Sequence, residues 1–274
     1  MRATPRTAGE ADGLIGPGEP APFCVWNPEG RAPVLVVCDH ASNRIPAALD
    51  NLGLDELALT RHIACDIGAG EVARQLARRL DAPAVLAEYS RLVVDCNRSL
   101  DDPTAFLAVS DGEVVPGNQG LTAEAKAGRA RQFYDPYHAA IRRHLEGFAG
   151  RGIVPAFIAV HTFTPILQDV ERPWEVGILW DTDPRIPVPL MSALRELGAS
   201  VGDNEPYSGR APSDYTVDHH AEAAGLPHVS LEIRQDLVEE PAGATRWAAL
   251  LGGALAGVLG NPRLHRVLDE GRDG

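Results

Sequence analysis

Short apolar runs alternate with longer amphipathic segments along this chain. Six runs have the length and the residue types of buried strands. They are residues 34–37, 84–87, 92–95, 154–160, 175–180 and 228–233, and Val201 is expected to end a further short strand. This spacing, with room for a helix between many of the strands, is typical of an α/β protein.

Helices are predicted at residues 55–62, 68–80, 122–148, 187–197, 217–224 and 242–258. The clearest is 68–80, in which Val72, Leu76 and Leu80 recur at helical spacing with arginines between them. In 122–148, Thr122 is expected to cap the helix and Pro136 to kink it. The polar segments 99–120 and 203–216 contain turn residues and are expected to be loops.

Strands that alternate with helices predict one α/β domain, with a mixed, mostly parallel sheet and helices on both faces. No internal repeat or shift in composition marks a second domain. Residues 1–20 are rich in Gly, Pro, Ala and charge without a period, so they are expected to form a loose leader. The folded domain is then expected to span residues 21–274.

The composition restricts the partners of the protein. With 38 acidic and 25 basic residues the formal net charge is −13, which argues against binding to nucleic acid. A small anionic substrate stays compatible, because a few arginines can reverse the field inside a pocket. No stretch reads as long and apolar enough to span a membrane, and no apolar segment follows the first ten residues as in a secretory signal. We expect a cytoplasmic protein with a small-molecule partner, either monomeric or a homo-oligomer.

The four cysteines, Cys24, Cys38, Cys65 and Cys96, show no C-x-x-C spacing. Three of them lie inside or beside apolar runs. Free thiols in a reducing compartment are therefore favoured over disulfides or a cysteine metal site.

The stretch 34–46, V-L-V-V-C-D-H-A-S-N-R-I-P, changes abruptly from an apolar strand to polar side chains. Enzymes of the α/β class present their sites at the carboxyl ends of strands, although a polar loop that merely caps the strand would look the same. Other predicted strands also end in ionisable groups. In a parallel sheet all of these ends converge at one edge: His40, Asp95, His161, Asp181 and Glu232.

His40 and His161 are candidate ligands for a zinc-type ion, because catalytic zinc sites use imidazole and carboxylate and keep one position open. Asp66, in C-D-I-G-A-G, is the candidate third ligand. The alternatives are a hydrogen-bonding role for either histidine and a helix N-cap for Asp66.

Three polar residues surround the run 92–95. Arg91, Asn97 and Arg98 can grip a carboxylate or polarise a carbonyl as charge develops on it. Alternatively, the arginines lie on the surface and pair with acidic neighbours, namely Glu88, Asp101 or Asp102.

Glu232 lies inside the apolar run V-S-L-E-I, where an unpartnered carboxylate is costly to bury. A general base would suit this place if burial raises its pKa; a structural ion pair with Arg234 or another arginine is the alternative. Asp218, His219 and His220 add protonatable groups, and a solvated helix face would explain at least one of them. A Walker-type phosphate loop and a G-x-S-x-G elbow are both absent from the sequence, which argues against nucleotide use and serine-dependent hydrolysis.

Seven segments, in order from about residue 34 to 238, resemble the N-formylglutamate amidohydrolase family. They are C-D-H-A-S-N-R-I-P, D-I-G-A-G, Y-S-R-L-V-V-D-C-N-R, H-T-F-T-P, D-N-E-P-Y-S-G-R, D-Y-T-V-D-H-H and L-E-I-R-Q-D-L. The resemblance implies a zinc-carboxypeptidase-like α/β fold, one zinc ion, and metal-assisted hydrolysis of an N-acyl acidic amino acid such as N-formylglutamate. Related alternatives are another metal-dependent deacylase, a carboxypeptidase-like hydrolase, or a non-catalytic relative that binds a carboxylate.

The wider group, which includes aspartoacylases and zinc carboxypeptidases, carries H-x-x-E, a D-x-N-R segment, a later histidine and a catalytic glutamate. The resemblance therefore assigns roles to several residues of this chain. His40 and His161 would bind metal, Glu232 would be the base, Arg91 would polarise the scissile carbonyl, and Asn97 and Arg98 would hold the substrate carboxylate.

One position departs from that pattern. Asn43 stands where H-x-x-E would place a glutamate, and a neutral amide is a poor zinc ligand. The third ligand is therefore open between Asp66, Asn43 and water. Ser42, Arg44 and His220 are expected to contact the substrate.

Overall fold

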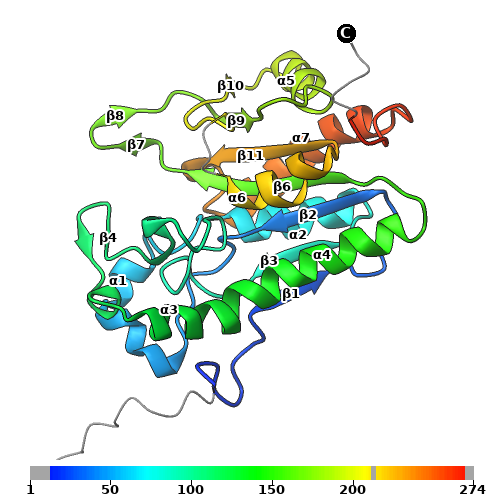
Figure 1. Cartoon of the computed structure of the whole chain (residues 1–274). Helices are drawn as coiled ribbons and strands as arrows, with labels where there is room; N and C mark the ends of the chain where they lie inside the picture. The colour runs from blue at the N-terminus through cyan, green and yellow to red at the C-terminus, as the bar shows by residue number, and fades with distance from the viewer. Residues whose placement is uncertain (1–12, 211–213, 269–274) are drawn as a thin grey trace, which may run out of the picture.

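A seven-stranded sheet runs through the protein, in the order β1-β3-β2-β6-β11-β9-β10. The computed structural model describes residues 13–210 and 214–268 (Figure 1). The strands of this sheet are β1 (Phe23–Trp26), β2 (Val34–Cys38), β3 (Ala84–Ala87), β6 (Ala156–Phe163), β9 (Val176–Leu179), β10 (Val201–Asp203) and β11 (His228–Arg234).

The four central strands β3, β2, β6 and β11 are parallel to one another. β1 is antiparallel to β3, and β9 is antiparallel to β11, with β10 parallel to β9. This confirms the predicted mixed, mostly parallel sheet. It also corrects one prediction: because β9 runs the opposite way, Asp181 follows it at the other edge of the sheet and does not converge with His40 and His161.

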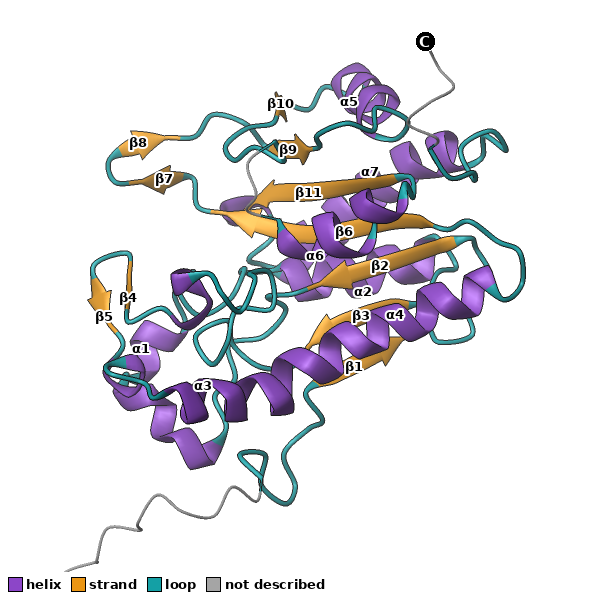
Figure 2. Cartoon of the chain, in the orientation of Figure 1, coloured by secondary structure: helices purple, strands orange, loops and turns teal. Residues whose placement is uncertain are grey.

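Helices cover both faces of the sheet, as predicted (Figure 2). One face packs against α2 (Ala69–Arg79), α5 (Pro187–Glu196) and α7 (Pro241–Leu259). The other packs against α4 (Asp135–Ala149) and α6 (Tyr215–His220), while α1 (Glu56–Leu59) and α3 (Ala123–Arg129) lie further along the same side. The likeness to a zinc carboxypeptidase in particular stays a prediction.

β2 shows why this arrangement follows from the sequence. Val34, Val36 and Cys38 point into the cluster beneath α2 and α7, while Leu35 and Val37 point into the cluster beneath α4. All five are at most 2% exposed. A strand covered on both faces needs a continuous apolar run rather than an alternating one, and the run 34–37 is of that kind.

The predicted strand at 92–95 is wrong, since these residues form a buried turn. The turn begins where the Val93 amide donates to the Ser90 carbonyl at 2.9 Å. Buried side chains then take the place of a neighbouring strand: Asn118 donates to the Leu92 carbonyl at 2.9 Å, and Arg129 donates to the Val93 carbonyl at 3.1 Å. Apolar composition alone does not distinguish such a turn from a strand.

The long helix predicted at 122–148 is confirmed but is interrupted. Thr122 caps α3 by accepting a hydrogen bond from the Ala125 amide. A π-helical turn over Ala130–Tyr134 then leads into α4, whose first turn contains Pro136. Proline lacks an amide hydrogen, so the irregularity falls where the sequence predicted a kink.

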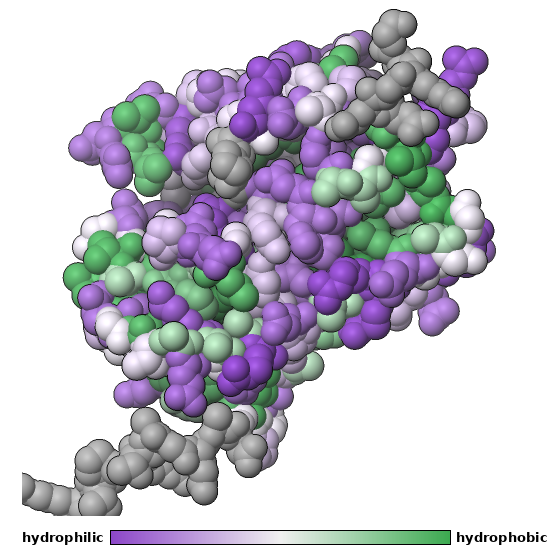
Figure 3. All heavy atoms as spheres, in the orientation of Figure 1, coloured by the Kyte–Doolittle hydropathy of each residue, from purple (hydrophilic) through white to green (hydrophobic). Residues whose placement is uncertain are grey.

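Smaller elements fill the segments predicted as loops. Residues 99–120 contain the hairpin β4 (Val109–Ser110)–β5 (Glu113–Val114), and a second hairpin follows β6, β7 (Ile166–Leu167)–β8 (Val170–Glu171). Both hairpins expose apolar side chains, and Figure 3 shows hydrophobic groups at the left of the molecule, where the hairpins lie. They lie toward the carboxyl ends of the central strands (Figure 1).

Val201 begins β10 rather than ending a strand. Residues 1–12 of the predicted leader lie outside the described residues, whereas Leu14 and Ile15 pack against the core. All four cysteines are free thiols, as predicted.

The expectation that no segment is long and apolar enough to cross a membrane is wrong for α7. This 19-residue helix passes that test by length and composition. In the structure, Trp247, Leu251 and Leu255 of α7 are buried in the same cluster as α2 and the sheet. The apolar residues of α7 are thus used to pack the helix against α2 and the sheet.

Candidate active site

Three buried residues meet at the carboxyl edge of the parallel strands. His40 follows β2, His161 lies within β6, and Asp66 lies just before α2. The Asp66 amide donates to the His40 carbonyl at 3.0 Å, which fixes the two segments side by side. Gly68, with a φ of 81°, occupies the N-cap position of α2 and no side chain caps that helix, so the N-cap alternative for Asp66 is wrong.

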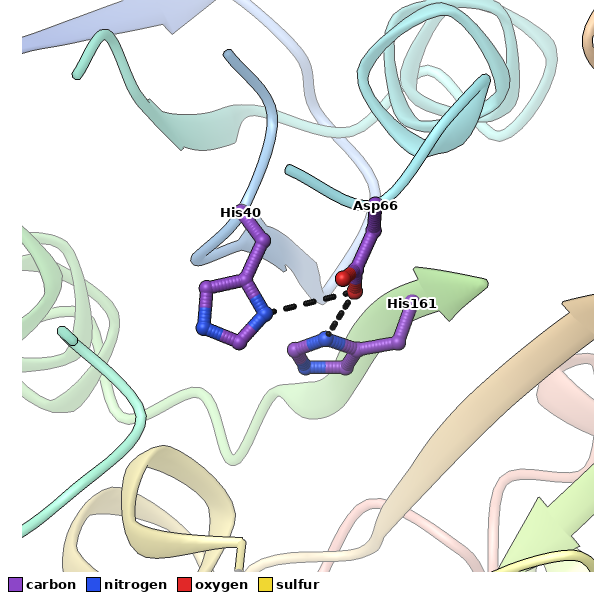
Figure 4. Close-up of side chains that lie close together, drawn as sticks. All are labelled: His40, Asp66 and His161. Atoms are coloured by element: carbon purple, nitrogen blue, oxygen red, sulfur yellow. Dashed lines mark hydrogen bonds and ion pairs between the residues drawn. The ribbon is translucent and has the colours of Figure 1, made fainter. Parts of the chain in front are cut away.

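The carboxylate of Asp66 contacts both imidazole rings (Figure 4). Its Oδ2 atom is 2.8 Å from Nδ1 of His161 and 3.3 Å from Nδ1 of His40. One potential ligand atom from each of the three residues lies within 4.8 Å of the others. Two imidazoles and one carboxylate are a donor set that suits a zinc-type ion.

The outer nitrogen of each ring also faces a buried carboxylate. Nε2 of His40 lies 2.8 Å from Oδ1 of Asp95, and Nε2 of His161 lies 3.2 Å from Oδ2 of Asp39. Although burial opposes ionisation, the hydrogen bond and charge of His161 lower the pKa of Asp39 to about 2. Metal-binding histidines characteristically present the outer nitrogen to a carboxylate in this way.

The charges of this cluster also suit a bound cation. Asp39, Asp66 and Asp95 are each at most 7% exposed, and Arg91 pairs with two of them, Asp66 and Asp95. The carboxylates thus exceed the permanent positive charge beside them. A divalent ion held by His40, Asp66 and His161 would offset that excess.

A cavity of about 190 Å³ opens beside the three residues. Most of the residues that the sequence singled out converge on it. Its walls are formed by His40, Asp66, Arg91, Asn97, Arg98, His161, Thr162, Leu179, Tyr207, Asp214 and Glu232.

Glu232 is 8% exposed and projects into this cavity from β11, directly beside His161 in the register of the sheet. Its Oε2 atom is buried without a hydrogen-bond partner among the described residues. Burial, aided by the charges of Asp66 and Asp214, raises the pKa of Glu232 to about 8, although His161 opposes the shift. Arg234 pairs with Asp236 at 2.8 Å, so the proposed ion pair between Glu232 and Arg234 is wrong.

The two arginines and the asparagine also line this cavity. Arg91 donates from Nε and Nη2 to Oδ2 of Asp95, at 3.0 and 2.6 Å, and its Nη1 is 3.5 Å from Asp66. Asn97 accepts a hydrogen bond from the Thr216 amide at 2.8 Å through Oδ1, which leaves its amide nitrogen as a donor. Arg98 donates to the Asn97 carbonyl at 2.8 Å.

Three residues of the opening polar stretch do not line the cavity. Asn43 donates to the Leu59 carbonyl at 2.8 Å, which leaves Asp66 as the carboxylate beside the histidines. Arg44 pairs with Glu88 at 3.0 Å, and Ser42 accepts a hydrogen bond from the Arg44 amide. The structure therefore gives no support for substrate contacts by Ser42 and Arg44.

His220 also lies away from the cavity. Its Nε2 atom is 2.9 Å from Nδ1 of His138, with the two rings stacked, and His138 contacts the Cys96 carbonyl at 3.0 Å. Its effect on the site is therefore indirect, through the segment that carries Asn97 and Arg98.

Sequence reasoning missed several residues of the site. Asp39 stands in the polar segment that was singled out but was given no role, and Asp95 was expected at this edge of the sheet without its contact with His40. Tyr207 and Asp214 fall in or beside the segment 203–216, which was interpreted only as a polar loop. The signal that could have found them is that they belong to D-N-E-P-Y-S-G-R and D-Y-T-V-D-H-H, two of the segments that carry the family resemblance.

A mostly parallel α/β sheet with a buried His–Asp–His donor set at its carboxyl edge defines the chain as an α/β protein with a candidate catalytic metal site. Residues 32–239 match the family model described as N-formylglutamate amidohydrolase. The chain therefore belongs to the N-formylglutamate amidohydrolase family, and the resemblance found in its motifs is confirmed.

The chain is also similar to individual proteins and solved structures. An N-formylglutamate deformylase of Pseudomonas putida is 27% identical over 230 residues, which cover 77% of this chain and 84% of that protein. The crystal structure of the gene product Atu2144 from Agrobacterium tumefaciens is 32% identical with a TM-score of 0.85, over 89% of this chain and 99% of that one. An N-formylglutamate amidohydrolase structure from Ralstonia eutropha JMP134 shares the fold, with 20% identity and a TM-score of 0.68 over 87% and 97% of the two chains.

Proposed function

We propose that the protein is a zinc-dependent amidohydrolase that removes a small acyl group, formyl first, from an acidic N-acylamino acid such as N-formylglutamate. The observation that carries the proposal is the meeting of two features in one cavity. The donor set of His40, Asp66 and His161 lies beside Glu232, whose buried carboxylate oxygen has no partner among the described residues. Membership of the family and the likeness to a deformylase support the choice of substrate.

His40, Asp66 and His161 are the residues that would hold zinc. When bound there, zinc would supply Lewis acidity toward a water molecule and the scissile carbonyl. Asp95 and Asp39 would keep each imidazole oriented with Nδ1 toward the site.

Glu232 is the proposed general base. It takes a proton from the attacking water and later delivers that proton to the leaving nitrogen. The place of its unpartnered oxygen in the cavity suits this exchange, because no other described residue competes for the oxygen.

The cationic groups of the cavity suit an anionic substrate. Arg91 would stabilise negative charge on the carbonyl oxygen, while Asn97 and Arg98 would hold the substrate carboxylate. A cavity of about 190 Å³ is smaller than the roughly 300–1,000 Å³ of pockets for drug-sized ligands, which favours a short acyl group.

A substrate panel combined with metal analysis tests the proposal. We expect zinc-supplemented protein to contain about one zinc per chain and to release formate from N-formylglutamate faster than it cleaves the acetyl or succinyl analogue. Faster cleavage of a longer acyl group would assign the protein to another deacylase. Sub-stoichiometric zinc and no turnover of any analogue would favour a non-catalytic carboxylate-binding relative.

We also propose that the protein works in the cytoplasm on a small-molecule substrate. The four free thiols support a reducing compartment, and the acidic net charge of −13 supports the absence of a nucleic-acid partner. Fractionation of cells followed by immunodetection would test the location.

A further inference from the structure

Asp214 is a buried carboxylate in the wall of the cavity that the mechanism above does not use. It is 5% exposed and lines the same cavity as Glu232 and Arg98. Its Oδ1 atom is buried without a hydrogen-bond partner among the described residues. Within residues 13–210 and 214–268, no Lys, Arg or His side chain forms an ion pair with it.

The ordinary use of an aspartate at this position does not apply. Asp214 occupies the N-cap position of α6, where a side chain usually accepts a hydrogen bond from the first turn, yet it makes no such bond. The Thr216 amide donates instead to Asn97, at 2.8 Å. Asp214 is also not one of the three residues whose ligand atoms meet at the candidate metal site.

A carboxylate buried in this way is costly unless a donor or a positive charge faces it. Since the protein does not supply one among the described residues, the ligand of the cavity is the natural source. The charge of Asp214 contributes to the raised pKa of Glu232, so the carboxylate of Asp214 lies within electrostatic range of the proposed base.

Hydrolysis of an N-acylamino acid generates a positively charged hydrogen-bond donor that could face the carboxylate of Asp214. The carbon–nitrogen bond breaks, the acyl carbon takes the oxygen of water, and the nitrogen acquires hydrogen. At neutral pH, N-formylglutamate and water become formate and glutamate, whose nitrogen has changed from a neutral N–H into an ammonium group. The nitrogen is separated by a single carbon from the carboxylate that Arg98 would hold, so both ends of that short unit fall within one small cavity.

We propose that Asp214 is the receptor for the amide N–H of the substrate and for the ammonium group of the amino-acid product. This inference rests on the proposed function. It makes Asp214 a specificity-determining residue that selects ligands with a nitrogen donor next to the bound carboxylate. Ligands that lack this donor would leave the carboxylate of Asp214 unpaired.

Binding of a matched pair of ligands tests the assignment without turnover. Glutamate and glutarate share both carboxylates and differ in the α-amino group. Calorimetry on the zinc-supplemented full chain should show that wild-type protein prefers glutamate by at least about tenfold, since a charged hydrogen bond contributes roughly 1.5–3 kcal/mol. Asp214→Asn should remove most of that preference, mainly through weaker binding of glutamate.

Asp218→Asn is the matched control, because it makes the same substitution one helical turn away at a residue that does not line the cavity. It should keep the preference for glutamate. Circular dichroism checks the fold of each variant, and Asp214→Ser serves if the asparagine variant does not fold. The assignment is overturned if wild-type protein shows no preference, binds neither ligand, or if both Asp214 variants retain the preference.

Formate release from N-formylglutamate by wild-type protein is measured separately. A protein that fails to release formate but still prefers glutamate through Asp214 would refute the proposed activity and keep the receptor. Formate release, together with Asp214 variants that keep the preference for glutamate over glutarate, would support the proposed activity and refute the receptor role of Asp214.

Discussion

Asp95 connects a candidate metal ligand to the arginine beside it. Its Oδ1 atom lies 2.8 Å from Nε2 of His40, and its Oδ2 atom accepts hydrogen bonds from Arg91 at 2.6 and 3.0 Å. One buried carboxylate therefore orients both the imidazole proposed to hold the metal and the guanidinium proposed to face the carbonyl. Its position follows from the turn at 92–95 that replaces the predicted strand.

Replacing Asp95 with Asn should lower zinc affinity by about 10–100-fold, because the carboxylate that orients His40 is lost. Competition with a chromogenic chelator measures this affinity. Asp101→Asn removes the same charge from an exposed neighbour and should leave it unchanged. Equal zinc affinity in wild-type and Asp95→Asn protein would show that His40 does not depend on this contact.

Replacing Glu232 with Gln should lower kcat by roughly 10²–10⁴-fold, because the amide cannot take the proton of the attacking water. Zinc content should stay at the wild-type level, since Glu232 is not part of the donor set. Glu239→Gln, at an exposed residue after β11, is the control. Full activity with zinc bound would refute the assignment of the base.

The pair His138 and His220 predicts a loss of stability in mild acid. Nε2 of His138 donates to the Cys96 carbonyl, so its Nδ1 accepts from Nε2 of His220, and both rings are neutral. Burial lowers the pKa of His138 to about 4 and that of His220 to about 3. The unfolded chain takes up protons below a pH of about 6.5 while the folded chain does not, so this stability is present above that pH and is lost as pH falls toward 4.

Replacing His220 with Gln should therefore make the free energy of unfolding less dependent on pH between 6.5 and 4, by at most about 1.4 kcal/mol per pH unit. Denaturant titrations at several pH values measure this slope. His144→Gln, at a half-buried histidine of α4 outside this pair, is the control. A slope for His220→Gln equal to that of the wild type would contradict the assignment.

Two glycines give opposite predictions for the same substitution. A Cβ on Gly177 of β9 would lie 2.0 Å from the Glu205 carbonyl oxygen and 3.3 Å from Cβ of Glu232. Gly177→Ala should destabilise the protein by about 1–3 kcal/mol or more and disturb the base. Gly253→Ala, on an exposed position of α7 with nothing within 4 Å, should stabilise it by about 0.5–1 kcal/mol. Thermal unfolding compares the two; a neutral Gly177→Ala would show that the Glu205 backbone yields easily.

The sequence predicted the part of the site that depends on strand ends. His40, His161 and Glu232 each belong to a strong apolar run, and the three runs are neighbours in a parallel sheet, so their convergence follows from a general rule of α/β folds. Asp181 follows an equally clear run but lies at the other edge. The direction of β9 is decided by pairing with β11, and nothing in the local pattern of residues 175–180 encodes it.

Residues on irregular segments were less predictable. Asp214 looked like one polar residue of a long loop, and its burial depends on packing of α6 against distant segments. Ser42 and Arg44 looked more promising because they adjoin His40 in sequence. Arg44 pairs with Glu88 and Ser42 accepts from the Arg44 amide, and neither lines the cavity, so closeness along the chain did not become closeness to the cavity.

The register between β6 and β11 fixes more than the fold. His161 and Glu232 are opposite one another on adjacent parallel strands, so the ladder of main-chain hydrogen bonds sets the distance between their backbones. A slip of one residue would turn either side chain to the far face of the sheet. Any change in the reach of the proposed base, in evolution or in redesign, is therefore confined to the length of the side chain. The fold therefore allows the position of the carboxylate to be changed only by the choice between Asp and Glu at residue 232.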